Sequence, residues 1–399
     1  MGKNSQNSQV NIPNQQLPNT GDKGTISDKN DPVKNPIKYP HNKIFYAGYN
    51  LGNDSVKLLV ESFAPIRTAS VVGYLQDENR SLLIPGSVEY QGWRLNNADI
   101  SWNQTNKNTW LGGDNVLDAE LKTLNRVYGN PTGKSEYSLH MFLSALALLE
   151  DKNGHRPNWR FKLAVSCHKP GLFSNIHKSL SGLHKVTLNG LSSEIEIEVV
   201  KTMPEGLGAA GEITSSKPKL AILDIGGGTT SVSHYQGSRP LLDKPEFYEK
   251  SGVLALYRTM LDSKQINGHP QGFTIDDVRI AVEAGMRDIV VNGQKLMEAN
   301  PNKPGTERVK KGILLGEKTR FDITHIYVEC LKNWLQAELK DACRKLAQLQ
   351  DKGYTVYVIG GGSKLPLLSD QLKKDPYNFN IATNGLYADV EGLLKIAKK

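Results

Sequence analysis

The feature that most constrains this chain is an apolar run that ends in an acid and three glycines, at residues 221–230 (Ala-Ile-Leu-Asp-Ile-Gly-Gly-Gly-Thr-Thr). The pattern predicts a buried strand, a glycine turn and a returning strand. Glycines let the backbone approach a bound group closely and turn its N–H groups toward it, as an anion such as phosphate requires. Asp224 would end the first strand, where its carboxylate could hold water or Mg²⁺ against that phosphate. Taken alone, the same residues could form a glycine-rich hairpin with an ordinary acid at a strand end.

Two other stretches supply the context that a single glycine motif lacks. Residues 356–362 (Val-Tyr-Val-Ile-Gly-Gly-Gly) predict a second strand ending in glycines, and a helix is expected to begin at Ser363. Residues 44–60 predict a strand, a turn through Asn-Leu-Gly-Asn-Asp-Ser at 50–55, and a returning strand that carries Lys57. Three phosphate-type turns at this separation are far more specific than any one of them.

On these turns the chain resembles the actin-like ATPase superfamily, and most closely the ParM type of bacterial actin, the plasmid-partition filament proteins. The resemblance runs from about Lys43 to the C-terminus. It implies an α/β, actin-like fold of two ribonuclease H-like lobes, with a nucleotide cleft between the lobes. The cofactors that it implies are ATP, for which GTP could substitute, and Mg²⁺.

The resemblance also assigns roles to particular residues. Glu205 lies in the segment at residues 203–210 that would join the two halves, where the family keeps a Glu that positions the attacking water; Asp224 would act beside it. Taken alone, Glu205 could be a loop carboxylate exposed to solvent. The residues expected to contact the nucleotide are Asn50, Gly52, Asn53, Asp54, Ser55, Lys57, Gly226, Gly227, Gly228, Thr229, Gly360, Gly361, Gly362 and Ser363.

One position departs from the family pattern inside this site. Asn50 stands where the family normally has an Asp near the metal. Asn50 and Asp224 are the expected metal-site residues, although Asn50 keeps one acceptor oxygen and lacks the charge. Alternatively, Asp54 in the same turn supplies the missing carboxylate. The sequence leaves the effect of Asn50 on the hydrolysis rate open.

The chain divides by composition into a tail and two expected lobes. Residues 1–42 are rich in Asn, Gln, Ser, Pro and Lys and cannot bury enough apolar surface to offset chain entropy, so a disordered polar tail is expected, either inert or a tether. Lobe I is expected over residues 43–205 together with a C-terminal helix within 382–399. Lobe II is expected over residues 206–381, with a small subdomain at about 264–320 whose Lys and Arg side chains could meet adenine or ribose.

Hydrophobic periodicity predicts the main helices and strands. Apolar residues recur every three or four positions from Leu139 to Leu149, which predicts a helix that begins after residues 131–133 and ends near residue 153. Further strands are expected at residues 69–74, 81–84, 161–165, 194–200 and 354–359, and further helices at 251–261, 274–284 and 322–349. Thr274 and Asp277 are an expected capping pair.

Composition limits the remaining possibilities. No apolar run reaches the roughly 18 to 20 residues that cross a bilayer, and the first residues lack an apolar signal core, so the cytoplasm is the expected compartment. The three cysteines, Cys167, Cys330 and Cys343, are too far apart for a disulfide framework or a paired metal motif and are expected in the core, with His168 as a loop imidazole. The net charge of +8 favours anionic partners, but the basic residues are spread along the chain.

Two classes of function remain from the sequence. The favoured one is an ATPase that polymerises head to tail with ATP and disassembles after hydrolysis, for DNA (plasmid) segregation or a cell-shape cytoskeleton. The scattered tryptophans show no stacking pattern, so DNA would be reached through an adaptor protein rather than bound sequence-specifically. The alternative is a small-molecule kinase of the same superfamily, for which the sequence shows no acceptor pocket with a general base. A chaperone-type switch would need a substrate domain that this chain lacks.

Overall fold

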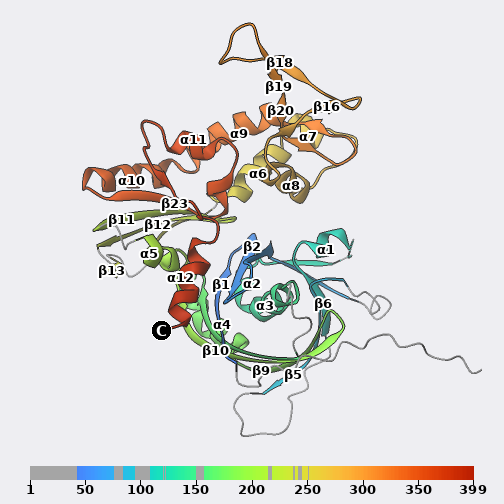
Figure 1. Cartoon of the computed structure of the whole chain (residues 1–399), viewed down its shortest axis with the longest axis vertical. Coiled ribbons are helices and arrows are strands. Elements are labelled where there is room, and N and C mark those ends of the chain that lie inside the picture. The colour runs from blue at the N-terminus through green and yellow to red at the C-terminus, as the bar shows by residue number, and fades with distance from the viewer. Residues whose placement is uncertain are drawn as a thin grey trace, which may run out of the picture. The chain divides into compact units, whose positions relative to one another are not determined.

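Two β-sheets with their helices make up the part of the chain that the computed structural model describes, residues 43–75, 84–94, 108–119, 121, 123–149, 157–213, 218–236, 239–240, 245–249 and 251–399. Figure 1 shows their arrangement. The expected tail at residues 1–42 lies outside these ranges. So does the expected strand at 81–84 apart from Ile84, which is not in a strand.

The first sheet has ten strands, in the order β3-β2-β1-β8-β10-β9-β5-β6-β4-β7. They are β1 (Phe45–Leu51), β2 (Ser55–Val60), β3 (Ile66–Ala69), β4 (Val71–Tyr74), β5 (Ser87–Arg94), β6 (Asn108–Gly112), β7 (Leu124–Arg126), β8 (Asn158–Ser166), β9 (Gly182–Leu188) and β10 (Leu191–Met203). Strand β1 lies antiparallel to β2 and parallel to β8, which in turn lies parallel to β10. The sheet curls around helix α3 (Ser138–Ala147) (Figure 1).

The second sheet has six strands, in the order β13-β12-β11-β23-β24, with β14 also paired to β12. They are β11 (Lys219–Ile225), β12 (Thr229–Gln236), β13 (Arg239–Pro240), β14 (Glu246–Glu249), β23 (Thr355–Ile359) and β24 (Asn380–Ile381). Strand β11 lies antiparallel to β12 and parallel to β23, as β1 does to β2 and β8. The same core topology is therefore built twice, although the literal sequence shows no repeat.

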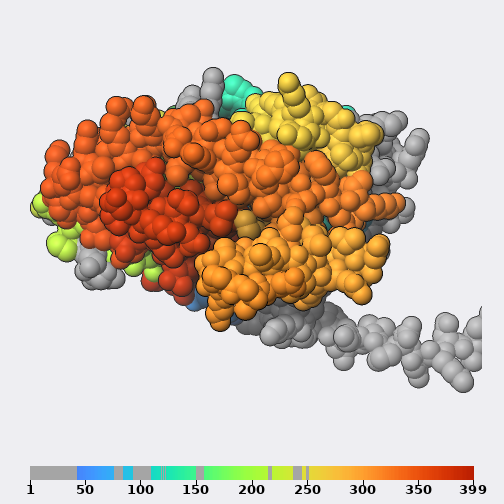
Figure 2. Space-filling model, turned by 90° about the horizontal axis from the view of Figure 1, so that it is seen from above, coloured from blue at the N-terminus to red at the C-terminus, as the bar shows by residue number. Residues whose placement is uncertain are grey.

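The remaining elements are helices and short strands. The helices besides α3 are α1 (Asn115–Asp118), α2 (Gly133–Glu136), α4 (Phe173–Leu180), α5 (Leu207–Ile213), α6 (Val253–Leu261), α7 (Lys264–Asn267), α8 (Ile275–Glu283), α9 (Thr324–Ala337), α10 (Lys340–Asp351), α11 (Leu368–Leu372) and α12 (Ala388–Ala397). Short strands run from β15 (Arg287–Asp288) to β22 (Phe321–Asp322). Nearly all residues from 291 to 308 in this stretch are exposed, and Figure 2 shows this orange part of the chain on the surface.

Several sequence expectations are confirmed. The apolar positions predicted to face the core from the helix are buried or partly buried in one cluster, although Leu149 lies just beyond the end of α3: Leu139, Phe142, Leu143, Leu146 and Leu149. Thr274 and Asp277 form the expected capping box at the start of α8. In β10 the apolar residues of 194–199 are buried and the alternate glutamates are exposed, as the alternation predicts, whereas Val200 is exposed. Cys167, Cys330 and Cys343 are free and buried.

Three expected elements are broken where tertiary contacts outweigh local propensity. The helix expected at residues 322–349 is two helices, α9 and α10, because Leu339 is fully buried and its N–H donates to the carbonyl of Trp334, five residues back. The helix expected after residues 131–133 is divided at Tyr137 into α2 and α3, and α3 ends at Ala147 rather than near residue 153. No proline or glycine marks either break.

The third break lies in the strand expected at residues 69–74, which Ser70 divides into β3 and β4. The Ser70 N–H donates to the Asp54 carbonyl at 2.7 Å, and its hydroxyl donates to the Gly52 carbonyl at 2.8 Å. These bonds hold the turn between β1 and β2. The helix expected at Ser363 is likewise a 3₁₀ turn, Gly361–Lys364, followed by the short α11.

Helices α5 and α12 join the two sheets. Ala209 and Ala210 of α5 pack in one cluster with residues of β11, β12 and β23, whereas Val390 and Leu393 of α12 pack with residues of β8 and β10. The two helices touch backbone to backbone, since a Cβ on Gly392 would lie 1.9 Å from the Gly208 carbonyl oxygen. Residues that begin these helices are therefore held firmly between the sheets. Within the described residues, no helix has the length and apolar character needed to span a membrane.

Candidate functional site

A cavity of about 200 Å³ opens where the two sheets meet. It is lined by Asn50, Gly52, Asn53, Asp54, Ser55, Lys57, Arg67, Glu205, Asp224, Gly226, Gly227, Gly228, Thr229, Val253, Tyr257, Glu283, Gly361, Lys364, Leu365 and Leu386. The structure thus brings together at one cavity all but three of the residues that the sequence singled out for nucleotide, water and metal. Gly360, Gly362 and Ser363 are the three that do not line it.

The first turn, residues 52–54 between β1 and β2, enters the cavity from the first sheet. Asn50 and Lys57 are direct partners in the β1–β2 ladder, so both side chains stand beside the turn. Burial lowers the pKa of Lys57, and the nearby Asp224 opposes that shift. Lys57 therefore places a cation deep in the cavity, next to the backbone of the turn.

The second turn, residues 226–228 between β11 and β12, faces the first turn directly. A Cβ on Gly227 would lie 2.0 Å from the Cβ of Asp54, so no larger residue fits there without a shift. The carbonyls of Gly226 and Gly227 accept from the N–H groups of Val253 and Leu254 at the start of α6. Because N–H and C=O point in opposite directions across a trans peptide, the N–H groups of Gly227 and Gly228 point away from α6.

The third turn, residues 360–362 after β23, supports the second sheet's side of the cavity. Gly360 has φ of +85°, and a Cβ there would lie 2.3 Å from Oδ1 of Asp224. Gly362 packs on Ile225, and the buried hydroxyl of Ser363 donates to the Gly360 carbonyl at 2.7 Å. These residues hold Asp224 and the turn in place, while Gly361 lines the cavity.

Two acids with opposite pKa shifts lie in the cavity. Burial and the neighbouring Glu205 raise the pKa of Asp224 to about 7. Burial acts to raise the pKa of Glu205 too, but the charge and hydrogen bond of Lys134, together with the charges of His168 and Lys57, outweigh burial and lower that pKa. The Lys134 Nζ lies 2.6 Å from Glu205 Oε1, and Lys134 is only 2% exposed. Glu205 is therefore held as a carboxylate, whereas Asp224 titrates near neutral pH.

Asp389, in the first turn of α12, forms a hub behind the cavity. Its Oδ1 accepts from the N–H groups of Gly206 and Gly208, at 3.1 and 3.0 Å. Its Oδ2 accepts from Asn50 Nδ2 at 2.8 Å and from the Ser166 hydroxyl at 2.6 Å. Asp389 thus ties the end of β1, the end of β8 and the start of α5 to α12, and it uses the amide N–H groups of Asn50 to do so.

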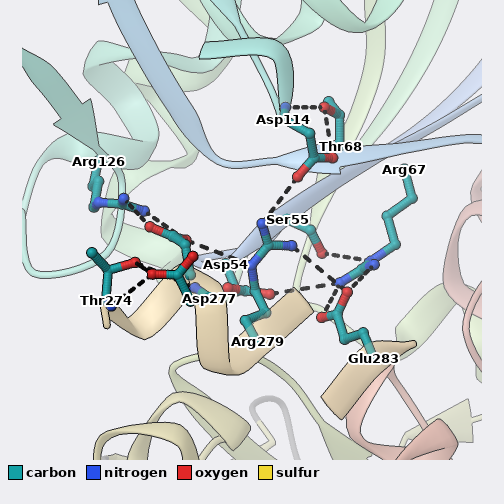
Figure 3. A network of polar contacts seen from close by, with 11 residues as sticks. Asp54, Ser55, Arg67, Thr68, Asp114, Arg126, Thr274, Asp277, Arg279 and Glu283 are labelled. Carbon is teal, nitrogen blue, oxygen red and sulfur yellow. Dashed lines mark hydrogen bonds and ion pairs between the residues drawn. The ribbon is translucent and has the colours of Figure 1, made fainter. Parts of the chain in front are cut away.

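A network of ion pairs lies at the rim of the cavity (Figure 3). Arg67 donates from both terminal nitrogens to Glu283 of α8, at 2.9 and 2.8 Å, and its guanidinium lies 3.7 Å from Asp54. Arg279 of α8 reaches Asp114 at 3.0 Å. Arg126 of β7 pairs with Asp276 of α8. The network therefore joins α8 to strands of the first sheet, and Asp54 takes part in it through Arg67.

Sequence reasoning missed several residues of this site, among them Lys134, Arg67, Glu283 and Asp389. Lys134, Arg67 and Glu283 come into place only by tertiary contact, and Asp389 looks like an ordinary acid in the first turn of a helix. A signal for Lys134 existed in Gly129-Asn-Pro-Thr-Gly-Lys-Ser, one residue shorter than the phosphate-binding pattern G-x-x-x-x-G-K-[ST]. None of the Lys and Arg side chains at residues 264–320 lines the cavity; from that range only Glu283 does.

The cavity residues fit a magnesium ion held together with a phosphate ligand. Among the described residues no three acids, histidines or cysteines converge on one point. Mg²⁺, however, is usually bound by one or two carboxylates with water and substrate phosphates. Asp224 supplies such a carboxylate, and its raised pKa reflects buried negative charge that a cation would offset. Because the Asn50 amide nitrogen is engaged with Asp389 and Ser166, its carbonyl oxygen is the group left to meet metal-bound water.

The raised pKa of Asp224 predicts how the nucleotide-free protein responds to pH. The folded pKa of about 7 exceeds the usual carboxyl value. The stabilisation from this group is therefore complete below about pH 4 and is lost as pH rises through 7. Asp224→Asn, which stays neutral, is expected to be more stable than wild type by about 1 to 3 kcal/mol at pH 8, with little difference at pH 4. Urea unfolding at both pH values measures this, and an equal difference at both would contradict it.

Comparison with solved structures identifies the fold. The structure matches ParM from a 15-stranded filament of Clostridium botulinum with a TM-score of 0.60 at 14% identity, over 89% of this chain and 98% of that chain. It matches Ta0583, an archaeal actin homolog, with a TM-score of 0.60 at 15% identity, over 89% of this chain and 99% of that chain. It also matches the structure of Bacillus thuringiensis ParM with ATP. The TM-score is 0.57 at 14% identity, over 89% of this chain and 98% of that chain. The chain therefore has the actin-like fold, as its three glycine turns predicted. No protein-family model and no curated protein matches the sequence.

Proposed function

We propose that this chain is a nucleotide-dependent, filament-forming ATPase of the ParM type. The observation that carries the proposal is the meeting of two facing glycine turns, one from each sheet, at a cavity that also holds Lys57, Asp224 and Glu205. Such turns present N–H groups to phosphate, and the paired carboxylates have different protonation behaviour. The actin-like fold and the ATP-bound ParM neighbour support the same conclusion.

In this proposal each cavity residue has a role in phosphoryl transfer. The two turns would grip the phosphates, Lys57 would offset their charge, and Asp224 would hold Mg²⁺. When bound, Mg²⁺ would neutralise charge on the β- and γ-phosphates. Glu205, kept as a carboxylate by Lys134, orients a water toward the γ-phosphorus. Catalysis then rests on positioning and electrostatics, the main contributions in this reaction class. Gly361, Tyr257 and Leu365 would line the adenosine side.

The same geometry supports nucleotide-dependent assembly. The cavity wall belongs to both sheets, and Arg67 and Glu283 connect them at the rim, so a ligand between the turns would bias how the two sheets are held. A head-to-tail contact that does not close gives an open filament, so one such sensitive surface suffices. The ParM filament neighbour supports self-assembly here. Segregation of plasmid DNA through an adaptor protein, or a cell-shape role in the cytoplasm, would be the cellular use.

The proposal predicts that assembly follows the nucleotide. Purified protein with Mg-ATP is expected to scatter light and pellet, and then to disassemble as ATP is consumed, because hydrolysis removes the γ-phosphate that both turns contact. Light scattering and phosphate release recorded together measure this, with ADP, GTP and EDTA as comparison conditions. Pelleting that is indifferent to nucleotide, or a monomer at tens of micromolar with Mg-ATP, would count against the filament. Phosphate transfer to a small acceptor in place of water would favour a kinase.

A further inference from the structure

Lys134 is a buried cation directly behind the cavity. It lies in the short helix α2, its side chain is 3% exposed, and its Nζ is 2.6 Å from Glu205 Oε1. Taking two charges out of water is costly, and a buried pair is weak evidence for stability. The position of this pair, rather than its contribution to stability, therefore needs explanation.

The pair is oriented, with the acid on the cavity side. Glu205 lines the cavity and Lys134 does not. Only Oε1 of Glu205 is engaged within the described part of the chain, by Lys134. The backbone next to it is also held, because the Gly206 N–H donates to Asp389 at 3.1 Å. One carboxylate oxygen is thus fixed from behind, and Oε2 remains for a group in the cavity.

The other titratable groups around the pair leave Lys134 as its main cation. Burial, and next the charge of Lys134, lower the pKa of His168 to about 4, so its ring is neutral at pH 7. Its Nδ1 has no hydrogen-bond partner among the residues that the structure describes. Lys57 acts on Glu205 more weakly than Lys134 does. Asp224 faces Glu205 with the same charge, and Cys167 and Lys169 lie near the pair. Removing Lys134 would therefore leave Glu205 buried beside Asp224.

We propose that Lys134 is a positioning residue for hydrolysis, which holds Glu205 by one oxygen and presents the other to the attacking water. The proposal rests on the proposed ATPase function. A carboxylate held in this way accepts a hydrogen bond from water in one direction and stays ionised across the neutral range. Without Lys134, Glu205 would take up a proton near neutral pH and lose the acceptor that orients the water.

The test compares Lys134→Met, Glu205→Gln and the double variant, with Lys395→Met as the control. Lys395 pairs with Glu212 at 2.5 Å outside the cavity and is largely exposed, so its loss removes a Lys–Glu ion pair without touching the site. Lys134→Met is expected to slow phosphate release by about 10 to 100-fold, as loss of an outer-shell partner typically does. The rate of phosphate release by Lys134→Met should rise with pH between 6 and 8, as Glu205 loses its proton. The wild-type rate should show no such rise, because Glu205 is already ionised in that range. Added to Glu205→Gln, Lys134→Met should cause no further loss.

A second readout needs no nucleotide. In Lys134→Met the folded pKa of Glu205 lies above its unfolded value, so stability relative to wild type should fall as pH rises from about 5 to 8. The double variant should lack this extra slope, since it carries neither charge. If Lys134→Met is too unstable to purify at pH 8, it should be recovered at pH 6.

Three results would overturn the proposal: an unchanged rate in Lys134→Met, an equal further loss in the Glu205→Gln background, or no folded Lys134→Met protein at either pH. Failure of the ATPase proposal would look different. In that case wild-type protein would release no phosphate, or Glu205→Gln would leave release unchanged, while the pH slope of stability would still report the pair.

Discussion

Glu205→Gln is expected to slow phosphate release by about 100-fold or more, the usual size of the effect when a positioned acid–base group is lost. Gln keeps an oxygen that can accept from Lys134, so the loop should stay in place, but it replaces the charged acceptor that faces the cavity. Nucleotide contacts from the two turns and Lys57 are untouched. Filaments should therefore still form with Mg-ATP and persist much longer. Phosphate release and light scattering from one sample measure both effects.

Glu212→Gln is the matched control for this variant. Glu212 lies on α5, seven residues from Glu205, and pairs with Lys395 at 2.5 Å, but it does not line the cavity. Its substitution should leave both assembly and turnover near wild type. Unchanged phosphate release in Glu205→Gln would show that another group positions the water. An equal loss in both variants would point to a general effect on α5 instead.

The three glycine turns could be predicted from the sequence because their signal is local. A strand that ends in consecutive glycines specifies both the turn and the close backbone approach, as Gly227 against Asp54 and Gly360 against Asp224 show. Amphipathic periodicity likewise predicted α3 and β10, since one face of each is buried. The actin-like fold itself was expected from the family resemblance that the three turns carry.

The groups that tune the site could not be predicted, because they act across long sequence separations. Lys134 meets Glu205 across 71 positions, Arg67 meets Glu283 across 216, and Asn50 meets Asp389 across 339. Nothing in the local composition around Lys134 or Asp389 states which buried group each will face. The break between α9 and α10 has the same origin, since burial of Leu339 decides it and no helix-breaking residue marks it.

Asn50→Asp is expected to lower the free energy of unfolding by about 2 to 4 kcal/mol at pH 8, the range for a buried, hydrogen-bonded group that loses its partner. The Asn50 Nδ2 donates to Asp389 Oδ2 at 2.8 Å, so an Asp at this position would place two carboxylates in contact. One of them would take up a proton, with a pKa raised above its unfolded value. The loss of stability should therefore be small below about pH 4 and grow as pH rises. Urea unfolding at several pH values measures this slope.

From the sequence alone, the charge of an Asp at this position would be expected to strengthen the metal site and speed hydrolysis. Because position 50 contacts Asp389, we expect no such gain in metal binding or hydrolysis. The new carboxylate would face the carboxylate of Asp389, which is already buried. Asn50→Asp in the presence of Asp389 should therefore bind a proton near neutral pH and do little for the Mg²⁺ dependence of phosphate release. Wild-type stability of Asn50→Asp at pH 8 would mean that the two side chains are not in contact.

Exchanging the two residues separates the charge effect from the lost hydrogen bond. In the double variant Asn50→Asp/Asp389→Asn, the amide at position 389 can accept from the N–H groups of Gly206 and Gly208 through its oxygen. Its nitrogen can donate to the new carboxylate on β1. Every hydrogen bond then keeps a donor and an acceptor, so most of the lost stability should return and the pH slope should disappear. The single Asp389→Asn variant is the control, because it leaves two amides facing each other.

With one carboxylate now at the end of β1 in the double variant, phosphate release should need less Mg²⁺ than in wild type. Recovered stability without that change would place the metal on Asp224 alone, and no recovery would show that Asp389 serves a partner other than Asn50.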